Sequence, residues 1–203
     1  MEQTRGLFIS LAGVLLGFGI LMVHSASITS WPTEFERVYL SRHLTFVAIG
    51  VVAAAVCAAV PARWWYRASP ALLAATIVLL VLVLIPGVGT SVKGAQRWLR
   101  YGPYSLQPSE LAKITATLFV CRQIVRSRTR RSRWPVAILR VIAPVAVVVP
   151  LVLVQPDLGT AAFIAVGCAV ALVAGNWPLR YFALAGAAVV PAAAWMISLR
   201  PYQ

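Results

Sequence analysis

Lys93-Gly94-Ala95-Gln96-Arg97-Trp98-Leu99-Arg100-Tyr101-Gly102 forms a polar, aromatic stretch that leads into Gln107-Pro108-Ser109-Glu110-Leu111-Ala112-Lys113, where a hydrophobic helix is expected to begin. The helix opens with a carboxylate, Glu110, and a lysine, Lys113, three residues apart. Elsewhere the chain is dominated by hydrophobic residues, which make up 61% of its 203 residues. Ionisable groups are costly beside a membrane, so those found there are candidates for a functional site. This stretch therefore indicates both where a helix starts and where a site should be sought.

The composition is that of an integral membrane protein. The mean hydropathy is +0.85 and only 11% of the residues are charged, against about 25% in soluble domains. A hydrophobic run of about 20 residues can cross a bilayer as a helix. We expect seven such spans, at residues 7–26, 44–60, 72–88, 111–124, 134–154, 158–173 and 181–197. The predicted fold class is all-α: a polytopic membrane helical bundle that forms one integral membrane domain over residues 1–203.

The distribution of basic residues predicts the orientation in the membrane. With the N-terminus in the cytoplasm, the loops place ten arginines on the inner side and six arginines and lysines on the outer side. Cytoplasmic loops carry the excess of Arg and Lys, and the dense run at residues 122–133 anchors that side. The net charge of +13 is then explained by contact with anionic membrane lipids. We therefore expect no nucleic-acid partner.

No cofactor motif is recognisable in the chain. The three cysteines, Cys57, Cys121 and Cys168, all fall inside expected spans and lack the spacing of metal ligands. The sequence contains no Walker loop, Rossmann glycine pattern or zinc motif. We therefore predict no metal site and no evident cofactor, and leave a divalent cation open.

Two of the expected spans, the fourth and the sixth, begin with similar polar residues. The fourth span opens at residues 107–110 (Gln-Pro-Ser-Glu) and the sixth at residues 155–157 (Gln-Pro-Asp). In both we expect Pro at the first helical position, Gln before it and an acid in the first turn. Two interpretations of Glu110 and Asp157 remain open. Each acid either stabilises the positive end of its helix or takes part in a site.

The predicted topology brings these polar residues to the outer face of the membrane. Helix N-termini together with Arg and Lys favour phosphate groups. Glu110 and Lys113 share a helical face and can pair. The chemistry indicated is recognition of an anionic, lipid-linked molecule at the outer leaflet. The candidate site residues are Lys93, Arg97, Arg100, Gln107, Glu110, Lys113, Gln155 and Asp157.

Three motifs together resemble one protein family. The pattern Gly-x-Gly-x-x-x-Lys-Gly-Ala-x-Arg-Trp at residues 87–98 is followed by Gln-Pro-Ser-Glu-x-x-Lys at 107–113 and Gln-Pro-Asp-Leu-Gly-Thr-Ala at 155–161. The chain thus resembles the SEDS family (shape, elongation, division and sporulation proteins), and is closer to its cell-division branch than to its elongation branch. The resemblance implies a protein of about ten spans in the bacterial cytoplasmic (inner) membrane. Such proteins polymerise lipid II into peptidoglycan glycan strands with a class B penicillin-binding protein and other division proteins as partners.

The resemblance also implies roles for individual residues. Arg97, Glu110, Lys113 and Asp157 match motif positions of functional importance in the family. The family's catalytic carboxylate lies in the outer loop after the seventh span, so we expect it beyond Gln203, together with the last three helices. The catalytic residue is therefore unknown within this chain. We expect the 203 residues alone to be inactive as a polymerase.

Three functions remain open at this point. The first is an enzyme, a peptidoglycan glycosyltransferase that polymerises lipid II. The second is a transporter that flips lipid II across the membrane. The third is a truncated, non-catalytic scaffold of the division machinery. Few charges lie in the inner halves of the expected spans, which argues against a polar transport path.

Overall fold

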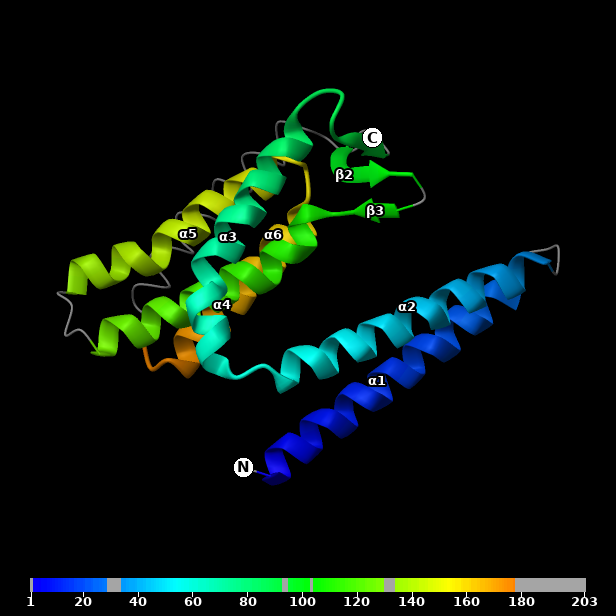
Figure 1. The fold of residues 1–203 in the computed structure, drawn as a ribbon, viewed down its shortest axis with the longest axis horizontal. Helices are drawn as coiled ribbons and strands as arrows, with labels where there is room; N and C mark the ends of the chain where they lie inside the picture. The colour runs from blue at the N-terminus through cyan, green and yellow to red at the C-terminus, as the bar shows by residue number, and fades with distance from the viewer. Residues whose placement is uncertain (1, 29–33, 93–94, 103, 130–133, 178–203) are drawn as a thin grey trace. The chain divides into compact units, whose positions relative to one another are not determined.

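The computed structural model describes residues 2–28, 34–92, 95–102, 104–129 and 134–177 (Figure 1). The seventh expected span, residues 181–197, and the candidate residue Lys93 lie outside these ranges. The chain divides into two compact units, Met1–Pro61 and Ala62–Gln203.

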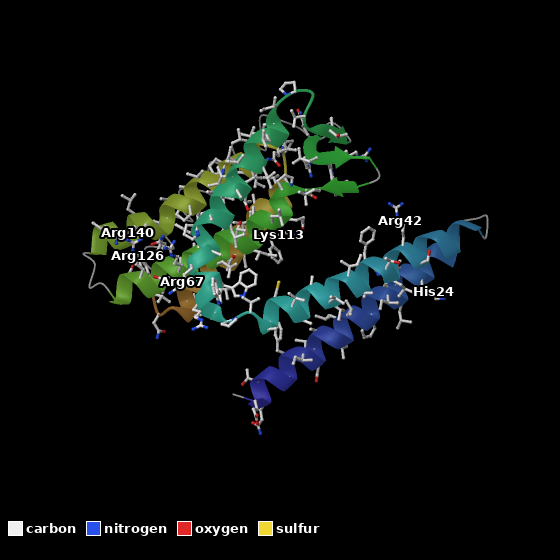
Figure 2. The ribbon with its side chains drawn as sticks, viewed as in Figure 1. His24, Arg42, Arg67, Lys113, Arg126 and Arg140 are labelled. Carbon is white, nitrogen blue, oxygen red and sulfur yellow. The ribbon has the colours of Figure 1, made fainter. Side chains whose placement is uncertain are left out.

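The first unit consists of two helices. Helix α1 covers Glu2–Ile28 and α2 covers Glu34–Ala59. Their segments Glu2–Ala26 and Ser41–Ala59 are long and apolar enough to cross a membrane, which confirms the first two expected spans. Their apolar side chains are exposed, as expected for helices that are hydrophobic all round and sit in lipid. Arg42 extends from α2 as an exposed basic side chain (Figure 2).

The described residues of the second unit form four helices and a small sheet, with the strands at one end of the helices (Figure 1). Helix α3 covers Ala62–Leu84, α4 covers Pro108–Thr129, α5 covers Trp134–Val154 and α6 covers Leu158–Ala174. The predicted bounds hold for α5 and hold within one residue for α6. Helix α3 was expected at residues 72–88, but it starts ten residues earlier. The Arg- and Trp-rich start of α3 continues the helix because polar and aromatic residues are tolerated at a membrane interface.

Three helices in the described part of the chain are long and apolar enough to span a membrane. These are α1, α2 and α3, of which α3 is the one in the second unit. The apolar segments Ile138–Val154 of α5 and Leu158–Ala174 of α6 are shorter. The helical membrane fold is therefore confirmed, whereas the number of seven spans stays a prediction.

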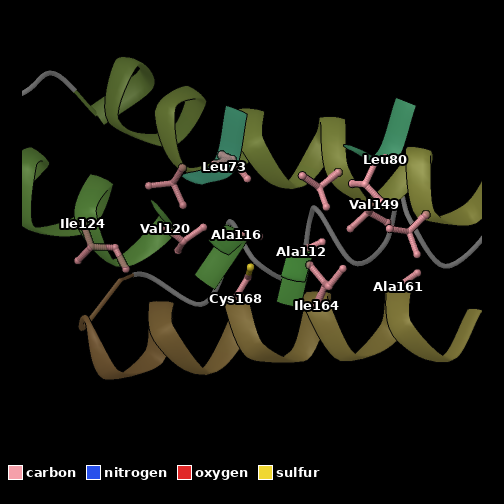
Figure 3. Close-up of a cluster of buried hydrophobic side chains, with 13 residues drawn as sticks. Leu73, Leu80, Ala112, Ala116, Val120, Ile124, Val149, Ala161, Ile164 and Cys168 are labelled. Carbon is pink, nitrogen blue, oxygen red and sulfur yellow. The ribbon is translucent and has the colours of Figure 1, made fainter. Parts of the chain in front are cut away.

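The core of the second unit lies along the shared faces of α3, α4, α5 and α6 (Figure 3). On α4 the buried apolar residues of the core recur every four positions and therefore form one stripe of the helix. They are Ala112, Ala116, Val120 and Ile124. The small side chains of Ala112 and Ala116 let the neighbouring helices approach closely. Figure 3 shows Ala112 and Ala116 facing Ile164 and Cys168 of α6.

Buried hydroxyl groups are hydrogen-bonded inside this core. The Oγ1 atoms of Thr76 on α3 and Thr115 on α4 are 3.1 Å apart. Each also lies within hydrogen-bond distance of the carbonyl oxygen four residues earlier in its own helix, 2.8 Å for Thr76 and 3.0 Å for Thr115. A hydroxyl that keeps such partners can be placed among apolar side chains at little cost.

The polar, aromatic stretch before α4 contributes to a three-stranded antiparallel sheet, which the sequence did not predict. Strands β1 (Thr90–Val92), β2 (Ala95–Tyr101) and β3 (Tyr104–Leu106) pair in the order β1-β2-β3. At the turn between β2 and β3, Gly102 has a φ of +58°, a conformation in which a side chain would be strained. Strands β1 and β3 have three residues each, too few to show an alternation of apolar and polar residues, and the seven residues of β2 do not alternate strictly. The sequence therefore did not predict them.

A glutamine fastens this sheet to the end of α3. The Nε2 atom of Gln96 on β2 donates to the carbonyl oxygens of Ile85 at 3.0 Å and Gly89 at 3.2 Å. A Cβ atom at Gly89 would collide with the Val83 carbonyl oxygen and approach the Gln96 side chain to 2.8 Å. Glycine is therefore needed where the chain leaves α3 and turns back into the sheet.

Candidate functional site

Asp157 lies in the turn between α5 and α6 and is the N-cap residue of α6. Helix α6 starts at Leu158, and the Oδ1 atom of Asp157 accepts a hydrogen bond from the backbone N–H of Thr160 at 3.2 Å. Aspartate suits this N-cap position because its short side chain satisfies a free helical N–H group. Pro156 precedes the cap, so the expectation that it is the first helical residue of the sixth span is wrong. In α4 the same expectation is confirmed, since the helix begins at Pro108.

The other oxygen of Asp157 joins the two polar motifs. Its Oδ2 atom accepts from Gln107 Nε2 at 3.0 Å and from Ser109 Oγ at 3.4 Å. Gln107 Nε2 also donates to Ser109 Oγ at 2.9 Å. The Asp157 side chain is only 10% exposed, and a carboxylate can be buried only when such partners replace water. The start of α4 and the start of α6 are thus held together by one carboxylate.

Arg97 brings strand β2 to the same turn. Its Nε donates to the Gln155 carbonyl oxygen at 2.9 Å and its Nη2 to the Pro156 carbonyl oxygen at 2.6 Å. Its Nη1 lies 3.9 Å from Asp157 Oδ1. Carbonyl groups at a helix C-terminus lack partners within the helix and attract cations. The Arg97 guanidinium is therefore engaged mainly in holding the end of α5 and the cap of α6.

Gln155 ties the turn to α3. Its side chain is 1% exposed, and its Nε2 donates to the Leu80 carbonyl oxygen at 3.2 Å. The Oε1 atom of Gln155 is buried without a hydrogen-bond partner in the described part of the chain. Arg97, Gln107, Ser109, Gln155 and Asp157 form what we call the turn network. The turn network connects the sheet with one end of each of α3, α4, α5 and α6, which is the outer end in the predicted orientation.

Glu110 and Lys113 form a separate pair on α4. Glu110 Oε2 lies 2.7 Å from Lys113 Nζ, which confirms the predicted pairing. The Glu110 side chain is 55% exposed and that of Lys113 is 23% exposed. Lys113 Nζ also lies 5.1 Å from the ring centroid of Phe163 on α6, a distance at which a cation is attracted to the ring face. In the described residues, neither charged side chain hydrogen-bonds to the turn network.

The eight predicted site residues therefore fall into distinct groups. Arg97, Gln107, Gln155 and Asp157 meet in the turn network, and the Glu110–Lys113 pair follows within two turns of the same helix start. Arg100 is exposed on β2, opposite Ser105 of β3, and Lys93 is not among the described residues. Sequence reasoning missed two contributors, Ser109 and Gln96. Both stood in the quoted motifs, but no pattern indicated what their side chains would contact.

The described part of the chain holds no cluster of three or more His, Cys, Asp or Glu side chains that could bind a metal ion. None of the three cysteines forms a disulfide bond; Cys57 and Cys121 are exposed and Cys168 is buried. The acids of the second unit are Glu110 and Asp157 alone, by sequence. Asp157 is already saturated by protein donors, so Glu110 is the acid of this unit with room for a ligand.

Comparisons with known proteins agree with one another. The family model described as cell cycle protein, FTSW_RODA_SPOVE, matches residues 5–203. A probable peptidoglycan glycosyltransferase FtsW of Aromatoleum aromaticum is 37% identical over 208 residues, which cover 100% of this chain and 51% of the relative. The protein of the same description from Nitrosomonas europaea is 35% identical over 163 residues, covering 78% of this chain and 42% of the relative. The chain thus spans about half the length of the curated relatives it matches.

Solved structures show the same relationship. The rod shape determining protein RodA of Thermus thermophilus superposes with a TM-score of 0.69 at 27% identity, over 88% of this chain and 57% of that one. A chain from a structure titled for the coordination of polymerization and crosslinking by a peptidoglycan synthase complex gives a TM-score of 0.66 at 29% identity. That match covers 94% of this chain and 55% of the other.

Proposed function

The chain belongs to the cell cycle protein family of FtsW, RodA and SpoVE, and from this premise we propose that it contributes the substrate-binding part of a peptidoglycan glycosyltransferase of cell division. Its substrate is lipid II, bound at the outer face of the bacterial cytoplasmic membrane. The names of the relatives support the activity and the division branch. The similarity to a chain of a peptidoglycan synthase complex supports a class B penicillin-binding protein as partner.

The reaction is transfer of a glycan from a lipid carrier to a sugar hydroxyl. A general base takes the proton of the acceptor hydroxyl, the oxygen forms a bond to the donor's anomeric carbon, and the bond from that carbon to the polyprenyl pyrophosphate breaks. Negative charge develops on the departing pyrophosphate, which a positioned cation stabilises. We assign the base to no residue of this chain.

The contacts assign different roles to the turn network and to the Glu110–Lys113 pair. The N–H groups of Arg97 are engaged by two backbone carbonyls and by Asp157. We therefore assign Arg97 to positioning and not to pyrophosphate binding. The Glu110–Lys113 pair remains accessible at the start of α4. Lys113 provides positive charge for the pyrophosphate, and the free N–H groups of the helix N-terminus add to it. Glu110 holds Lys113 in place, and a divalent cation beside it stays a prediction.

The observation that carries this proposal is the junction at Asp157, which binds the second motif through Gln107 and Ser109 and the first through Arg97. It fixes the start of α4, and the accessible Glu110–Lys113 pair lies within the first two turns of that helix.

The test measures glycan synthesis by a full-length protein of this family that carries these residues. It is combined with a penicillin-binding partner whose transpeptidase is inactivated, and with labelled lipid II. We expect Lys113→Met and Glu110→Gln to reduce the glycan product on a gel by about 100-fold, the usual cost of losing one transition-state donor.

The matched control is Arg42→Gln, which removes an exposed arginine of α2 and should leave the product unchanged. Normal product from both Glu110→Gln and Lys113→Met would refute the assignment of the pair. Movement of lipid II across vesicle membranes without any glycan product from the wild-type protein would favour the transporter instead.

The proposed orientation has its own test. A membrane-impermeant thiol reagent is applied to intact cells that express variants lacking the three native cysteines. We expect labelling of a cysteine placed at Ser91, next to the sheet, and none at Ser127, near the end of α4. The reverse pattern would overturn both the orientation and the outer-face site.

A further inference from the structure

Lys113 of α4 is contacted by an aromatic ring of another helix. Its Nζ atom lies 5.1 Å from the ring centroid of Phe163 on α6. An aromatic ring attracts a cation at this distance through the negative charge of its face. Phe163 is 64% exposed, so burial in the core does not account for the position of its ring beside the ammonium group.

The shared starts of α4 and α6 bring the two side chains to the same level. Helix α4 begins at Pro108 and α6 at Leu158, and Asp157 joins these starts in the turn network. Lys113 and Phe163 each follow five residues after the first residue of their helix, which corresponds to about 7.5 Å along either helix axis. The ammonium group and the ring are therefore at equal depth.

Close packing of the two helices keeps the ring within reach of the lysine. Ala112 precedes Lys113 and Ile164 follows Phe163 in the sequence. Ala112 and Ile164 are both buried in the core, where they face each other (Figure 3). The small alanine side chain lets the helices approach closely. The buried neighbours thus fix the backbone at both positions, and the lysine and the ring lie at the rim of this contact.

Glu110 and Phe163 hold Lys113 by different means. The Glu110 carboxylate, 2.7 Å from Nζ, brings a negative charge that offsets the positive one, and its side chain is 55% exposed. An exposed ion pair of this kind is weak. A neutral ring attracts an ammonium group without cancelling its charge. The ring can therefore restrain the flexible lysine stem from a second helix while the positive charge stays available for an anion.

We propose that Phe163 is a positioning residue for Lys113 in the proposed lipid II site. The inference rests on the proposed function, in which the Lys113 ammonium group stabilises the departing pyrophosphate. The ring keeps this group at the level set by the shared helix starts. A cation held in place needs little rearrangement when negative charge develops on the leaving group. We assign to Phe163 no contact with the reacting atoms.

The test replaces the ring in a full-length protein of this family that carries these residues. Glycan synthesis is measured with labelled lipid II and a penicillin-binding partner whose transpeptidase is inactivated. We expect Phe163→Leu, which keeps an apolar side chain but removes the ring, to lower kcat/KM about ten-fold, the effect of a partly desolvated cation–π contact. Phe163→Trp should keep kcat/KM close to the wild-type value, because indole attracts cations at least as well.

The matched control is Phe18→Leu, which changes a phenylalanine of α1 that is 63% exposed and should leave kcat/KM unchanged. Because Phe163 is itself exposed, its variants should keep the fold, which circular dichroism checks. Should Phe163→Leu nevertheless fail to fold, the fluorinated rings described next decide the question, since they keep the aromatic side chain.

Fluorinated phenylalanines at position 163 separate attraction by the ring from packing. Each added fluorine withdraws negative charge from the ring face with little change in size, and so weakens the attraction for a cation. We expect kcat/KM to fall stepwise from one to three fluorine atoms, whereas a role in packing alone would leave the series flat. In the Lys113→Met background, Phe163→Leu should cause no further loss, because no ammonium group is left to hold.

A failure of this role can be told apart from a failure of the proposed function. A flat fluorine series, or equal losses in Phe163→Leu and Phe18→Leu, beside a large loss in Lys113→Met would overturn the role of Phe163 and leave the proposed function standing. Independent, multiplying losses from Phe163→Leu and Lys113→Met would do the same. Normal product from Lys113→Met would overturn both.

Discussion

The two ends of the helices α3–α6 differ in how their charged side chains are distributed. At the turn network, Asp157 is matched by Arg97, Gln107, Ser109 and the N-terminus of α6, while nearby Glu110 is matched by Lys113. The opposite end of the helices, which we call the arginine end, carries five arginines, whereas both acids in the sequence of this unit belong to the turn-network end. These arginines are Arg63, Arg67, Arg122, Arg126 and Arg140. The difference indicates that opposite charges meet at one end, which we call the matched end, while positive charge accumulates at the other.

The matched end can be compact because few residues separate the elements that meet there. Only residues 155–157 join α5 to α6, so the last carbonyls of one helix and the first N–H groups of the next lie together. Arg97 satisfies the carbonyls and Asp157 satisfies an N–H group. Opposite partial charges of two helix ends are thus balanced by one ion pair.

The largest effect on stability is expected when the carboxylate of Asp157 is removed from the matched end. Asp157→Ala takes away the N-cap of α6, which is worth about 0.5–2 kcal/mol, and charge-assisted hydrogen bonds worth about 1.5–3 kcal/mol. We expect the free energy of unfolding in uncharged detergent to fall by roughly 2–4 kcal/mol, allowing for overlap of the two contributions. Denaturant unfolding followed by circular dichroism measures it.

Asp157→Asn separates the two contributions. Asparagine caps helices as well as aspartate does, so this variant should keep the cap. It loses the charge opposite Arg97 and, because an amide nitrogen replaces Oδ2, the acceptor for Gln107 Nε2. We expect about half of the destabilisation of Asp157→Ala. The exposed Ser105→Ala on β3 is the control for the sheet and should be neutral. A stability of Asp157→Ala within 0.5 kcal/mol of the wild type, the range of ordinary surface changes, would show that the turn network does not organise this end.

A smaller effect is expected at the Glu110–Lys113 pair. Because more than half of the Glu110 side chain is exposed, a double-mutant cycle with Glu110→Gln and Lys113→Met should give a coupling energy below about 1 kcal/mol. The coupling should shrink further at 1 M salt, where exposed charges are screened. Both are read from unfolding curves of the two single variants and the double variant.

The outcome at this pair sharpens the functional assignment. A large loss of glycan synthesis beside a small coupling energy would assign the pair to substrate binding. A coupling of several kcal/mol would instead make Glu110 and Lys113 part of the matched scaffold, since a buried pair loses that much when one partner is removed.

The smallest effect is expected at the arginine end, and its sign depends on the surroundings. Arg63→Gln relieves the repulsion with Arg67 one turn away, so in uncharged detergent at low salt it should raise the free energy of unfolding by about 0.2–0.5 kcal/mol. In micelles containing phosphatidylglycerol the gain should disappear, because the lipid phosphate already balances the charge. Destabilisation by Arg63→Gln in uncharged detergent would mean that the chain itself supplies an anionic partner there.

Much of the fold could be predicted because hydrophobic runs and helix starts are local features. The helix at 134–154 and the pairing of Glu110 with Lys113 follow from run length and i,i+3 spacing. The early start of α3 could not be predicted in the same way, since its first ten residues are polar and aromatic and gain their helical state at an interface. The position of Pro156 before the cap, rather than in the helix, depends on the contact of Asp157 with Thr160.

By itself, the sequence determined the membrane class, the helical fold, the family and the motif residues. Hydrophobicity, charge and short spacings are local properties that can be read from the order of the residues. Only the tertiary structure decided which motif residues meet: Asp157 binds Gln107 across fifty positions, and Arg97 reaches the carbonyl of Gln155 across fifty-eight. It also decided that Arg97 is engaged by backbone carbonyls while Glu110 and Lys113 stay accessible. The physical reason is that a long-range contact depends on how helix ends pack in space, which no local pattern of residues records.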